Sequence, residues 1–314
     1  MFDETRGSVV AIRETKPGLE SSLKGEYDRC TKALNRLGLI TLLPQTERLG
    51  VIGFDGKEYP RPELAQVQEA LDKNRALVER KRQEGFTKLQ LVPLASPIQV
   101  LIQRAREAVI RHTKEGNIFQ AKQNPSDPDI PVQVNIEDPL YVWDEILTGD
   151  QTNNLVYFPE SFTKSHQGLT KDKMVIDPTI CAVPGWSIGL VEDASFLPRS
   201  GQGKTVGGRK QIENNQSPNQ YLQILSQTPY QGETGWAPED FLTNFLTTLE
   251  TTNQVSHDWN DNSAAWLIGT YLPKEGIVPY AYWARYDRKL GLDGSDPDYQ
   301  DDYYGLPSTV RLDL

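Results

Sequence analysis

The sequence predicts an α+β fold built from two regions, and three observations support this. Apolar residues within 1–135 recur every three or four positions, which is the period of an amphipathic helix. After residue 251 this period disappears, and short apolar runs alternate with Gly, Asp and Asn, as in short strands and irregular loops. All six tryptophans follow residue 135, whereas only six of the phenylalanines and tyrosines precede it. We therefore expect a mainly helical region at 1–135 and a mixed domain at 136–314.

The first region is expected to contain three helices and one hairpin. Each helix has an apolar face and ends at a glycine that is suited to a left-handed cap, and the last two begin at a proline. The pair Asp55-Gly56, between two short apolar runs, indicates a β-hairpin within 49–59. The expected helices run from Leu19 to Leu37, from Pro62 to Gly85 and from Pro97 to Gly116.

Arg80, Lys81 and Arg82 lie in the last turn of the second expected helix. A basic run of this kind is typical of nucleic-acid patches, but cations in a last turn also complement the helix dipole. We expect these three side chains to lie on a solvated face. Residues 123–138 contain several prolines and no periodic pattern, so a linker or long loop is expected there.

The second region is expected to alternate short strands with two helices. Each helix is signalled by a residue followed by proline, at Ser217-Pro218 and at Ala237-Pro238, and the second has an apolar face that continues to Leu249. The expected strands are 155–158, 186–191, 264–268, 278–283 and 309–312.

Charge and composition exclude several classes of protein. The chain of 314 residues carries a formal net charge of -10, with 37% hydrophobic and 24% charged residues, as in a globular protein. Residues 1–135 hold 21 Lys and Arg against 18 Asp and Glu, so the net charge is +3 there and -13 in residues 136–314. An acidic second half argues against binding to a nucleic-acid backbone.

No apolar run of 18 residues and no signal peptide is found, so no membrane insertion and no classical export are expected. The expected location is cytoplasmic, or on a virion or cell surface reached by a non-classical route.

No motif for catalysis, metal binding or cofactor binding is complete, so no catalytic residue, no metal site and no cofactor is predicted. The segment from Ser200 to Thr205 ends in Gly-Lys-Thr, like a phosphate-binding loop, but Pro198 stands where that loop requires its first glycine. A flexible basic loop is expected, and a nucleotide-binding or hydrolytic enzyme that uses this loop is the alternative. Four aspartates leave open either a cation site or a solvated acidic loop, namely Asp296, Asp298, Asp301 and Asp302.

Tyrosines are concentrated near the end of the chain. Seven of the 13 tyrosines lie between Tyr271 and Tyr304, mixed with Asp, Ser, Gly and Arg. This mixture is typical of binding loops, because tyrosine offers a large rigid contact area at a small cost in conformational entropy. An ordinary tyrosine-rich surface is the simpler alternative.

Five short motifs follow one another in a fixed order within residues 140–314. They are Gly235-Trp-Ala-Pro238, Trp259-Asn-Asp-Asn, Ala264-Ala-Trp, Tyr282-Trp-Ala-Arg285, and Gly305 followed by Ser308-Thr-Val-Arg311-Leu. This order resembles the end of C-type-lectin-like domains of the formylglycine-generating-enzyme type. More narrowly, it is similar to the variable proteins of diversity-generating retroelements, in which a reverse transcriptase rewrites adenine-derived codons and the fold displays the changed side chains.

The resemblance implies a C-type-lectin-like ligand-binding domain at 136–314 with a variable region at about 257–314. The implied scaffold positions are Trp283, Arg285, Arg288, Gly305, Val310 and Arg311. The implied displayed positions are Tyr280, Tyr282, Ala284, Tyr286, Asp287, Asp293, Asp298, Tyr299, Asp301, Asp302 and Tyr304. The Glu-Pro-Asn motif of sugar-binding lectins and the cysteine pair of formylglycine chemistry are absent, so neither of those activities is implied.

The expected function is therefore non-enzymatic binding of a ligand, a protein or a cell-surface molecule, through a hypervariable face. A reverse transcriptase gene is expected nearby. A structural or virion component, whose tail forms a subunit interface, is a further alternative.

Overall fold

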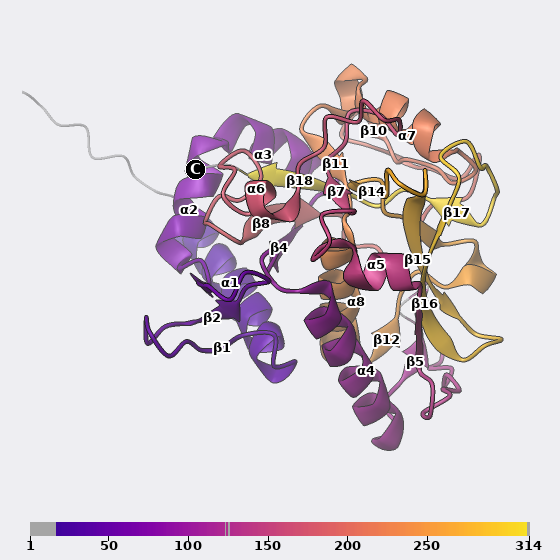
Figure 1. The fold of residues 1–314 in the computed structure, drawn as a ribbon, viewed down its shortest axis with the longest axis horizontal. Coiled ribbons are helices and arrows are strands. Elements are labelled where there is room, and N and C mark those ends of the chain that lie inside the picture. The colour runs from indigo at the N-terminus through magenta and orange to yellow at the C-terminus, as the bar shows by residue number, and fades with distance from the viewer. Residues whose placement is uncertain (1–16, 123, 125, 313–314) are drawn as a thin grey trace, which may run out of the picture.

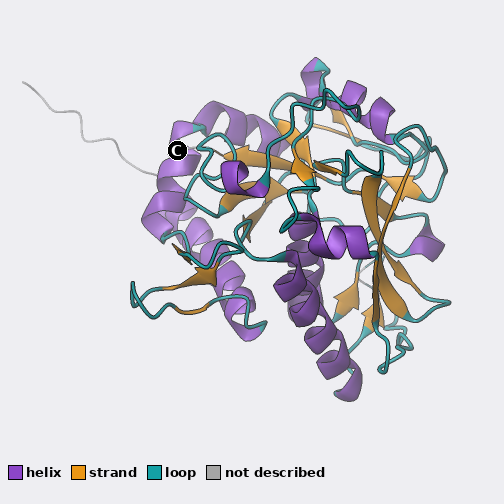
Figure 2. Cartoon of the chain, in the orientation of Figure 1, coloured by secondary structure: helices purple, strands orange, loops and turns teal. Residues whose placement is uncertain are grey.

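The computed structural model describes residues 17–122, 124 and 126–312, and it shows a mixed α+β fold (Figures 1 and 2). The helices are α1 (Pro17–Arg36), α2 (Leu64–Lys73), α3 (Arg75–Gln83), α4 (Ile98–Lys114), α5 (Asp144–Gly149), α6 (Lys171–Met174), α7 (Pro218–Leu225), α8 (Pro238–Thr252) and the 3-10 turns η1 (Thr228–Tyr230) and η2 (Trp259–Asp261).

Two sheets dominate the strand content. A four-stranded antiparallel sheet has the order β11-β18-β8-β4, from β11 (Glu233–Gly235), β18 (Ser308–Leu312), β8 (Ser187–Val191) and β4 (Lys88–Val92). A five-stranded mixed sheet has the order β17-β13-β15-β16-β6, from β17 (Tyr304–Gly305), β13 (Ala264–Trp266), β15 (Val278–Ala284), β16 (Lys289–Ser295) and β6 (Leu140–Val142).

Four smaller sheets, of two or three short strands each, lie outside the two main sheets. The remaining strands are β1 (Thr41–Leu42), β2 (Leu49–Ile52), β3 (Glu58–Pro60), β5 (Phe119–Gln120), β7 (Val156–Tyr157), β9 (Thr205–Val206), β10 (Arg209–Lys210), β12 (Gln254–Val255) and β14 (Thr270–Tyr271). Their pairings are β1-β2-β3, β9-β10, β5-β12 and β7-β14.

Helix α8 lies at the centre of the molecule and contacts both main sheets, through β4 and through β15 (Figure 1). Helices α1 and α4 pack on α8, so the helical region and the tail of the chain share one hydrophobic core, which extends from Leu23 to Leu312. Strand β4 adds the N-terminal region to the four-stranded sheet by pairing with β8. The change in charge at residue 135 therefore does not coincide with a break in packing.

The sequence patterns that predicted the N-terminal helices are mostly confirmed. Gly38, Gly85 and Gly116 follow helices α1, α3 and α4 with φ of 65°, 102° and 71°, as expected for left-handed caps. The side chain of Leu19, the first apolar residue of the expected pattern, lies outside the residues whose side chains are described. Strands β2 and β3 form the expected hairpin around Gly56.

The single helix expected from Pro62 to Gly85 is wrong, because the chain forms two helices separated at Asn74. The Asn74 side chain donates a hydrogen bond to the carbonyl of Ala70 at 2.9 Å. The break is visible in the backbone of Asn74, which has φ of -97° and ψ of 20°, although its amide also donates to the Ala70 carbonyl at 3.1 Å.

Lys81 is not solvated, contrary to the expectation for the basic run. Its side chain is completely buried, and Nζ lies 2.7 Å from both Glu84 and Glu233. Glu233 also binds Arg209, at 2.7 Å. Glu84 lies only three residues after Lys81, but the completely buried partner, Glu233, lies on β11, so no local pattern around residues 80–82 indicated it.

All five strands and both helices that were predicted for the second region occur at the predicted places, as β7, β8, β13, β15, β18, α7 and α8. Helix α7 begins at a Ser217 cap whose hydroxyl accepts a hydrogen bond from the amide of Gln220 at 3.3 Å. The described residues between 124 and 138 form no helix and only an isolated bridge at Pro131, which confirms the expected loop.

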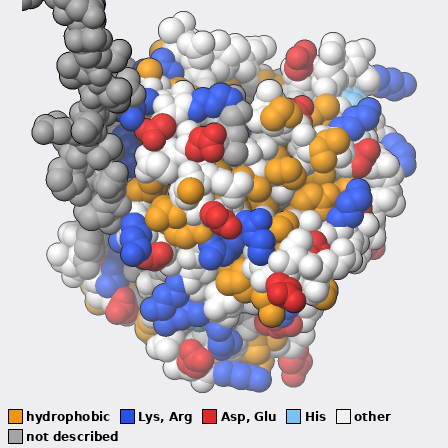
Figure 3. Space-filling view, turned by 90° about the vertical axis from the view of Figure 1, so that its left-hand side faces the viewer, with side chains coloured by type: hydrophobic (Ala, Val, Ile, Leu, Met, Phe, Trp, Pro, Cys, Tyr) orange, Lys and Arg blue, Asp and Glu red, His pale blue; other side chains and the backbone are white. Residues whose placement is uncertain are grey.

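The surface that carries α1–α3 mixes charges of both signs. Figure 3 shows that Lys and Arg side chains are interspersed there with Asp, Glu and apolar side chains. Within the part of the chain that the structure describes, none of the helices combines the length and the apolar character that crossing a membrane requires.

Candidate ligand-binding face

Strands β15 and β16 form a long hairpin whose two sides differ sharply. Alternate side chains of a strand point to opposite sides of a sheet. On the inner side Trp283 is completely buried, and its ring stacks on Phe245 of α8 with 6.4 Å between ring centroids. On the other side, Tyr280 pairs in register with Asp293 and Tyr282 pairs with Gly291. We call this second side, which carries Tyr280 and Tyr282, the outer face.

The outer face holds a continuous cluster of aromatic rings. Tyr280 and Tyr282 stack at 5.8 Å between centroids, and Trp259 of η2 lies 5.0 Å from Tyr282. Tyr303 stacks on Trp259 at 5.1 Å. The members of this aromatic cluster are Trp259, Trp266, Tyr280, Tyr282, Tyr299, Tyr303 and Tyr304.

Two of the predicted displayed residues are buried, and those predictions are wrong. Tyr304 is only 4% exposed, because its ring stacks on Trp266 at 4.8 Å and is met edge-on by Tyr280 at 4.9 Å. It therefore forms the floor of the aromatic cluster. Ala284, the last residue of β15, is 7% exposed, and its carbonyl accepts a hydrogen bond from the Arg288 amide at 2.7 Å.

The other predicted displayed residues reach the surface to different degrees. Tyr286 is 92% exposed at the tip of the β15–β16 hairpin, and Tyr299 is 42% exposed in the loop before β17. Tyr280, Tyr282 and Asp293 are half-buried between these two sites. Asp287, Asp298 and Asp302 are exposed, and Asp301 is half-buried.

Contacts fix the loop that precedes β17. The carboxylate of Asp301 accepts hydrogen bonds from the hydroxyl of Tyr299 at 3.1 Å and from the amide of Tyr303 at 3.0 Å. Asn219 of α7 donates to the carboxylate of Asp298 at 2.7 Å. Asp298 therefore anchors the loop to α7, whereas the rings of Tyr299 and Tyr303 are held at the surface.

Burial and neighbouring carboxylates keep the tyrosine hydroxyls protonated. Burial, helped by Asp293 and Asp287, raises the pKa of Tyr282 to about 12. Burial and Asp293 also raise the pKa of Tyr280. At neutral pH the outer face therefore offers neutral phenol groups as hydrogen-bond donors beside acidic side chains, a combination that suits a basic or polar partner.

The predicted scaffold residues support the face from behind. Arg285 leaves the end of β15 and pairs with Asp258 at 2.5 Å and with Asp261, which fixes η2 and its Trp259 against the hairpin. Burial raises the pKa of Asp258, and Arg285 opposes this shift. The Arg285 ion pairs therefore position the aromatic cluster.

Three more scaffold positions are set by close packing or by backbone geometry. Arg311 is 8% exposed, and its guanidinium contacts Asp240 at 2.5 Å and Ser187 at 2.6 Å. A Cβ on Gly305 would lie 2.9 Å from the side chain of Leu197, so the close approach there requires glycine. Val310 is buried within β18.

Arg288 acts through its backbone. Its φ of 59° closes the turn between β15 and β16, and its carbonyl accepts the amide of Asn135 at 2.9 Å. The side chain is exposed, so its identity is not explained by packing.

Sequence reasoning missed four residues of the outer face. Trp259 and Tyr303 belong to the aromatic cluster, and Tyr141 of β6 lies beside Gly291 in register with 42% of its surface exposed. A Cβ on Gly291 would lie 2.6 Å from the ring of Tyr282, so this glycine lets the ring lie across β16. Trp259 belongs to a resemblance motif and to the implied variable region at about 257–314, but it was not among the implied displayed positions, and no pattern linked Tyr141 to that region.

His257 is a buried titratable group behind the outer face. It is 2% exposed, and its ring lies 5.5 Å from those of Trp236 and Phe241. Burial lowers its pKa to about 4. Glu192 and Arg209 line the same small cavity.

We expect the folded protein to lose stability as the pH falls from about 6.5 towards 4. In the unfolded chain His257 is protonated near its ordinary pKa of about 6.5, whereas in the folded chain it is protonated only near pH 4. The free energy of unfolding should therefore fall by about 3 kcal/mol over this range. Urea unfolding at several pH values measures it. His257→Asn tolerates the left-handed φ of 56° and removes the titration, so it should flatten this part of the profile. An unchanged pH profile in that variant would contradict the assignment.

The segment from Ser200 to Thr205 does not have the geometry of a phosphate-binding loop. A hairpin, β9–β10, follows it, whereas a phosphate-binding loop opens a helix. The amide of Gly203 already donates to the carboxylate of Glu213 at 2.7 Å, and the amide of Ser200 donates to Asn214 at 2.7 Å. These contacts use the donors that would otherwise bind an anion.

Metal-binding and thiol chemistry find no support among the described residues. No group of three or more His, Cys, Asp or Glu side chains in them is arranged to hold a metal ion. Burial raises the pKa of Cys30 to about 11 and that of Cys181 to about 12, which disfavours the reactive thiolate.

Comparison of the chain with protein-family models, with curated proteins and with solved structures finds no match. The structure shows an α+β chain with a partly exposed aromatic cluster beside acidic side chains, on and around the β15–β16 hairpin.

Proposed function

We propose that the protein is a non-enzymatic ligand-binding protein and that the outer face is its binding site. The observation that supports this most is the difference in burial between side chains of the β15–β16 hairpin. Trp283 on the inner side is completely buried against α8, whereas Tyr286 at the tip is 92% exposed and no described contact explains its presence.

The proposal includes the family suggested by the sequence, the variable proteins of diversity-generating retroelements with a C-type-lectin-like fold. Such a site needs side chains that can change without loss of the fold. Tyr286, Asp287 and Asp302 meet this condition because they are exposed. Tyr304 does not meet it, so it belongs to the scaffold.

Sequencing natural copies of the gene tests this class. Variation should concentrate at the outward positions of the hairpin, such as Tyr280, Tyr282 and Tyr286, and should spare Trp283 and Gly291. A reverse transcriptase gene and a near-copy of the tail should lie nearby. Variation spread evenly over inward and outward positions would overturn the retroelement assignment.

The chemistry of the face favours a basic partner. Asp287 and Asp293 lie close enough to Tyr282 to raise its pKa, and ring surfaces beside carboxylates attract Lys and Arg side chains. An immobilised peptide rich in Lys and Arg should bind the protein more tightly than a matched peptide rich in Glu.

The double variant Asp287→Asn, Asp293→Asn should weaken this binding several-fold, whereas Asp172→Asn on the exposed side of α6 should not. Binding should also weaken as sodium chloride rises, because salt screens exposed charges. Binding that is indifferent to salt and to the double variant would exclude this site. Dissociation of an oligomer by Tyr286→Ser, seen in size-exclusion chromatography, would instead favour a subunit interface.

A further inference from the structure

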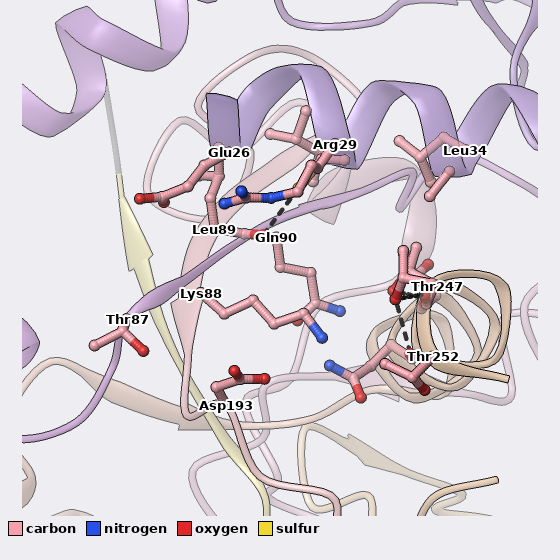
Figure 4. A pocket seen from close by; sticks show the side chains of 16 residues that line it. Glu26, Arg29, Leu34, Thr87, Lys88, Leu89, Gln90, Asp193, Thr247 and Thr252 are labelled. Carbon is pink, nitrogen blue, oxygen red and sulfur yellow. Dashed lines mark hydrogen bonds between the residues drawn. The ribbon is translucent and has the colours of Figure 1, made fainter. Parts of the chain in front are cut away.

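A cavity lies on the opposite side of α8 from Trp283, between α1, β4 and α8 (Figure 4). Its volume is about 330 Å³, within the range of small-molecule pockets. Strand β4 contributes Lys88 and Gln90, whose side chains both extend towards the wall formed by α8 (Figure 4). Helix α8 contributes Thr243, Asn244 and Thr247.

Two of the side chains that line the cavity have a polar atom without a hydrogen-bond partner within the described structure. Thr243 is completely buried, and its hydroxyl has no hydrogen-bond partner within the described structure. Gln90 is 5% exposed; its Nε2 donates to the carbonyl of Asp240 at 3.1 Å, while its Oε1 has no partner there. Leaving buried polar atoms unpaired costs free energy, so such atoms in a cavity indicate a missing occupant.

The charges around the cavity balance one another. Arg29 and Lys88 supply two positive charges, and Glu26 and Asp193 supply two negative ones. The partnerless atoms belong to uncharged side chains, and none of the lining residues is aromatic. This arrangement selects an uncharged ligand that is held by hydrogen bonds and by apolar contact with Leu34 and Leu91, without stacking on a ring.

We infer that this cavity binds a small uncharged ligand with adjacent hydrogen-bond donors and acceptors, of polyol or carboxamide chemistry. A donor on the ligand meets Oε1 of Gln90, and a neighbouring group meets the hydroxyl of Thr243. The Asn244 side chain, which is 5% exposed and lines the same wall, offers a further donor and acceptor. The bound ligand joins α1 and β4 to the central helix α8.

Thermal unfolding and saturation-transfer NMR on the full chain test the inference, with a hexose and inositol as the polyol probes and nicotinamide as the carboxamide probe. At about ten times its Kd, a bound probe should raise the Tm by about 2 °C. A response to the polyols alone or to nicotinamide alone identifies which of the two chemistries the cavity takes.

Thr243→Val removes the partnerless hydroxyl and keeps the shape of the side chain. It should raise the Tm of the free protein and weaken probe binding about tenfold. Thr248→Val is the control, because Thr248 is buried on the same helix but does not line the cavity. Gln90→Leu provides a second variant that should also weaken binding. The absence of any probe response in the wild type, or equal responses in the wild type and Thr243→Val, would overturn the inference and leave water as the occupant.

Discussion

Lys171→Met is expected to destabilise the protein by about 3–5 kcal/mol, because it leaves two buried carboxylates without their cation. The Lys171 ammonium lies 2.8 Å from Asp150 and 2.9 Å from Glu239, and all three side chains are completely buried. It also donates to the carbonyl of Ser96 at 2.6 Å. The lysine thus joins α6 to α8 and to the start of α4.

The pH dependence of this loss distinguishes an electrostatic cause from a packing defect. Burial raises the pKa of Glu239 even with Lys171 present, and removing the cation favours the protonated carboxyl further. A carboxyl whose pKa is higher in the folded state stabilises that state at low pH and loses the contribution as pH rises. The gap between wild type and Lys171→Met should therefore be smaller at about pH 5 than at about pH 8.

Urea unfolding of both proteins across this range measures the effect. Lys173→Met is the matched control, because Lys173 is exposed on the same helix, and its cost should stay within about 0.5 kcal/mol. A loss below about 1 kcal/mol for Lys171→Met, or a gap that does not change with pH, would contradict the role given to this ion cluster.

Ion clusters formed by residues that are far apart in the chain could not be predicted from local sequence patterns. Lys81 was expected on a solvated face because cations in the last turn of a helix complement the helix dipole, whereas its completely buried partner Glu233 lies on β11. Periodicity reports which side of a helix is apolar, but it does not report which buried acid will meet a lysine. Lys171, Asp150 and Glu239 come together for the same reason from three separate segments.

Five of the nine strands of the two main sheets, β4, β6, β11, β16 and β17, also escaped the sequence patterns. In β4, Gln90 is buried beside Leu89 and Leu91, so the strand lacks the polar-apolar alternation of a half-exposed strand. In β16, Gly291 and Gly294 interrupt the pattern. Gly291 is there because the Tyr282 ring crosses the strand, which is a tertiary reason. By contrast, the apolar period of α8 and its proline start were sufficient to predict that helix.

Composition placed many tyrosines and aspartates near the end of the chain but did not say which of them are exposed. In the structure, the pleat of β15 separates the half-buried Tyr280 and Tyr282 from the buried Trp283. Composition did not distinguish Tyr304 from Tyr299. The ring of Tyr304 packs on Trp266, whereas Tyr299 is 42% exposed. That difference depends on the parallel pairing of β17 with β13.

Substitutions in the β15–β16 hairpin test whether its inner side is structural scaffold and its outer face is free to bind a ligand. Trp283→Ala should cost about 3–5 kcal/mol, because it empties a completely buried site that stacks on Phe245. Tyr286→Ala, three residues later, should change stability by less than about 0.5 kcal/mol, since its side chain is 92% exposed.

Tyr282→Ala is the decisive variant, because it removes a half-buried ring of the aromatic cluster next to Trp283 in the chain. Losing about half the burial of such a ring should cost about 1 kcal/mol, well below the cost of Trp283→Ala. Urea unfolding of the three variants gives the comparison directly. If Tyr282→Ala cost as much as Trp283→Ala, the outer face would be part of the hydrophobic core. Tyr282 could then not be replaced without loss of stability, and the proposed binding site would have to lie elsewhere.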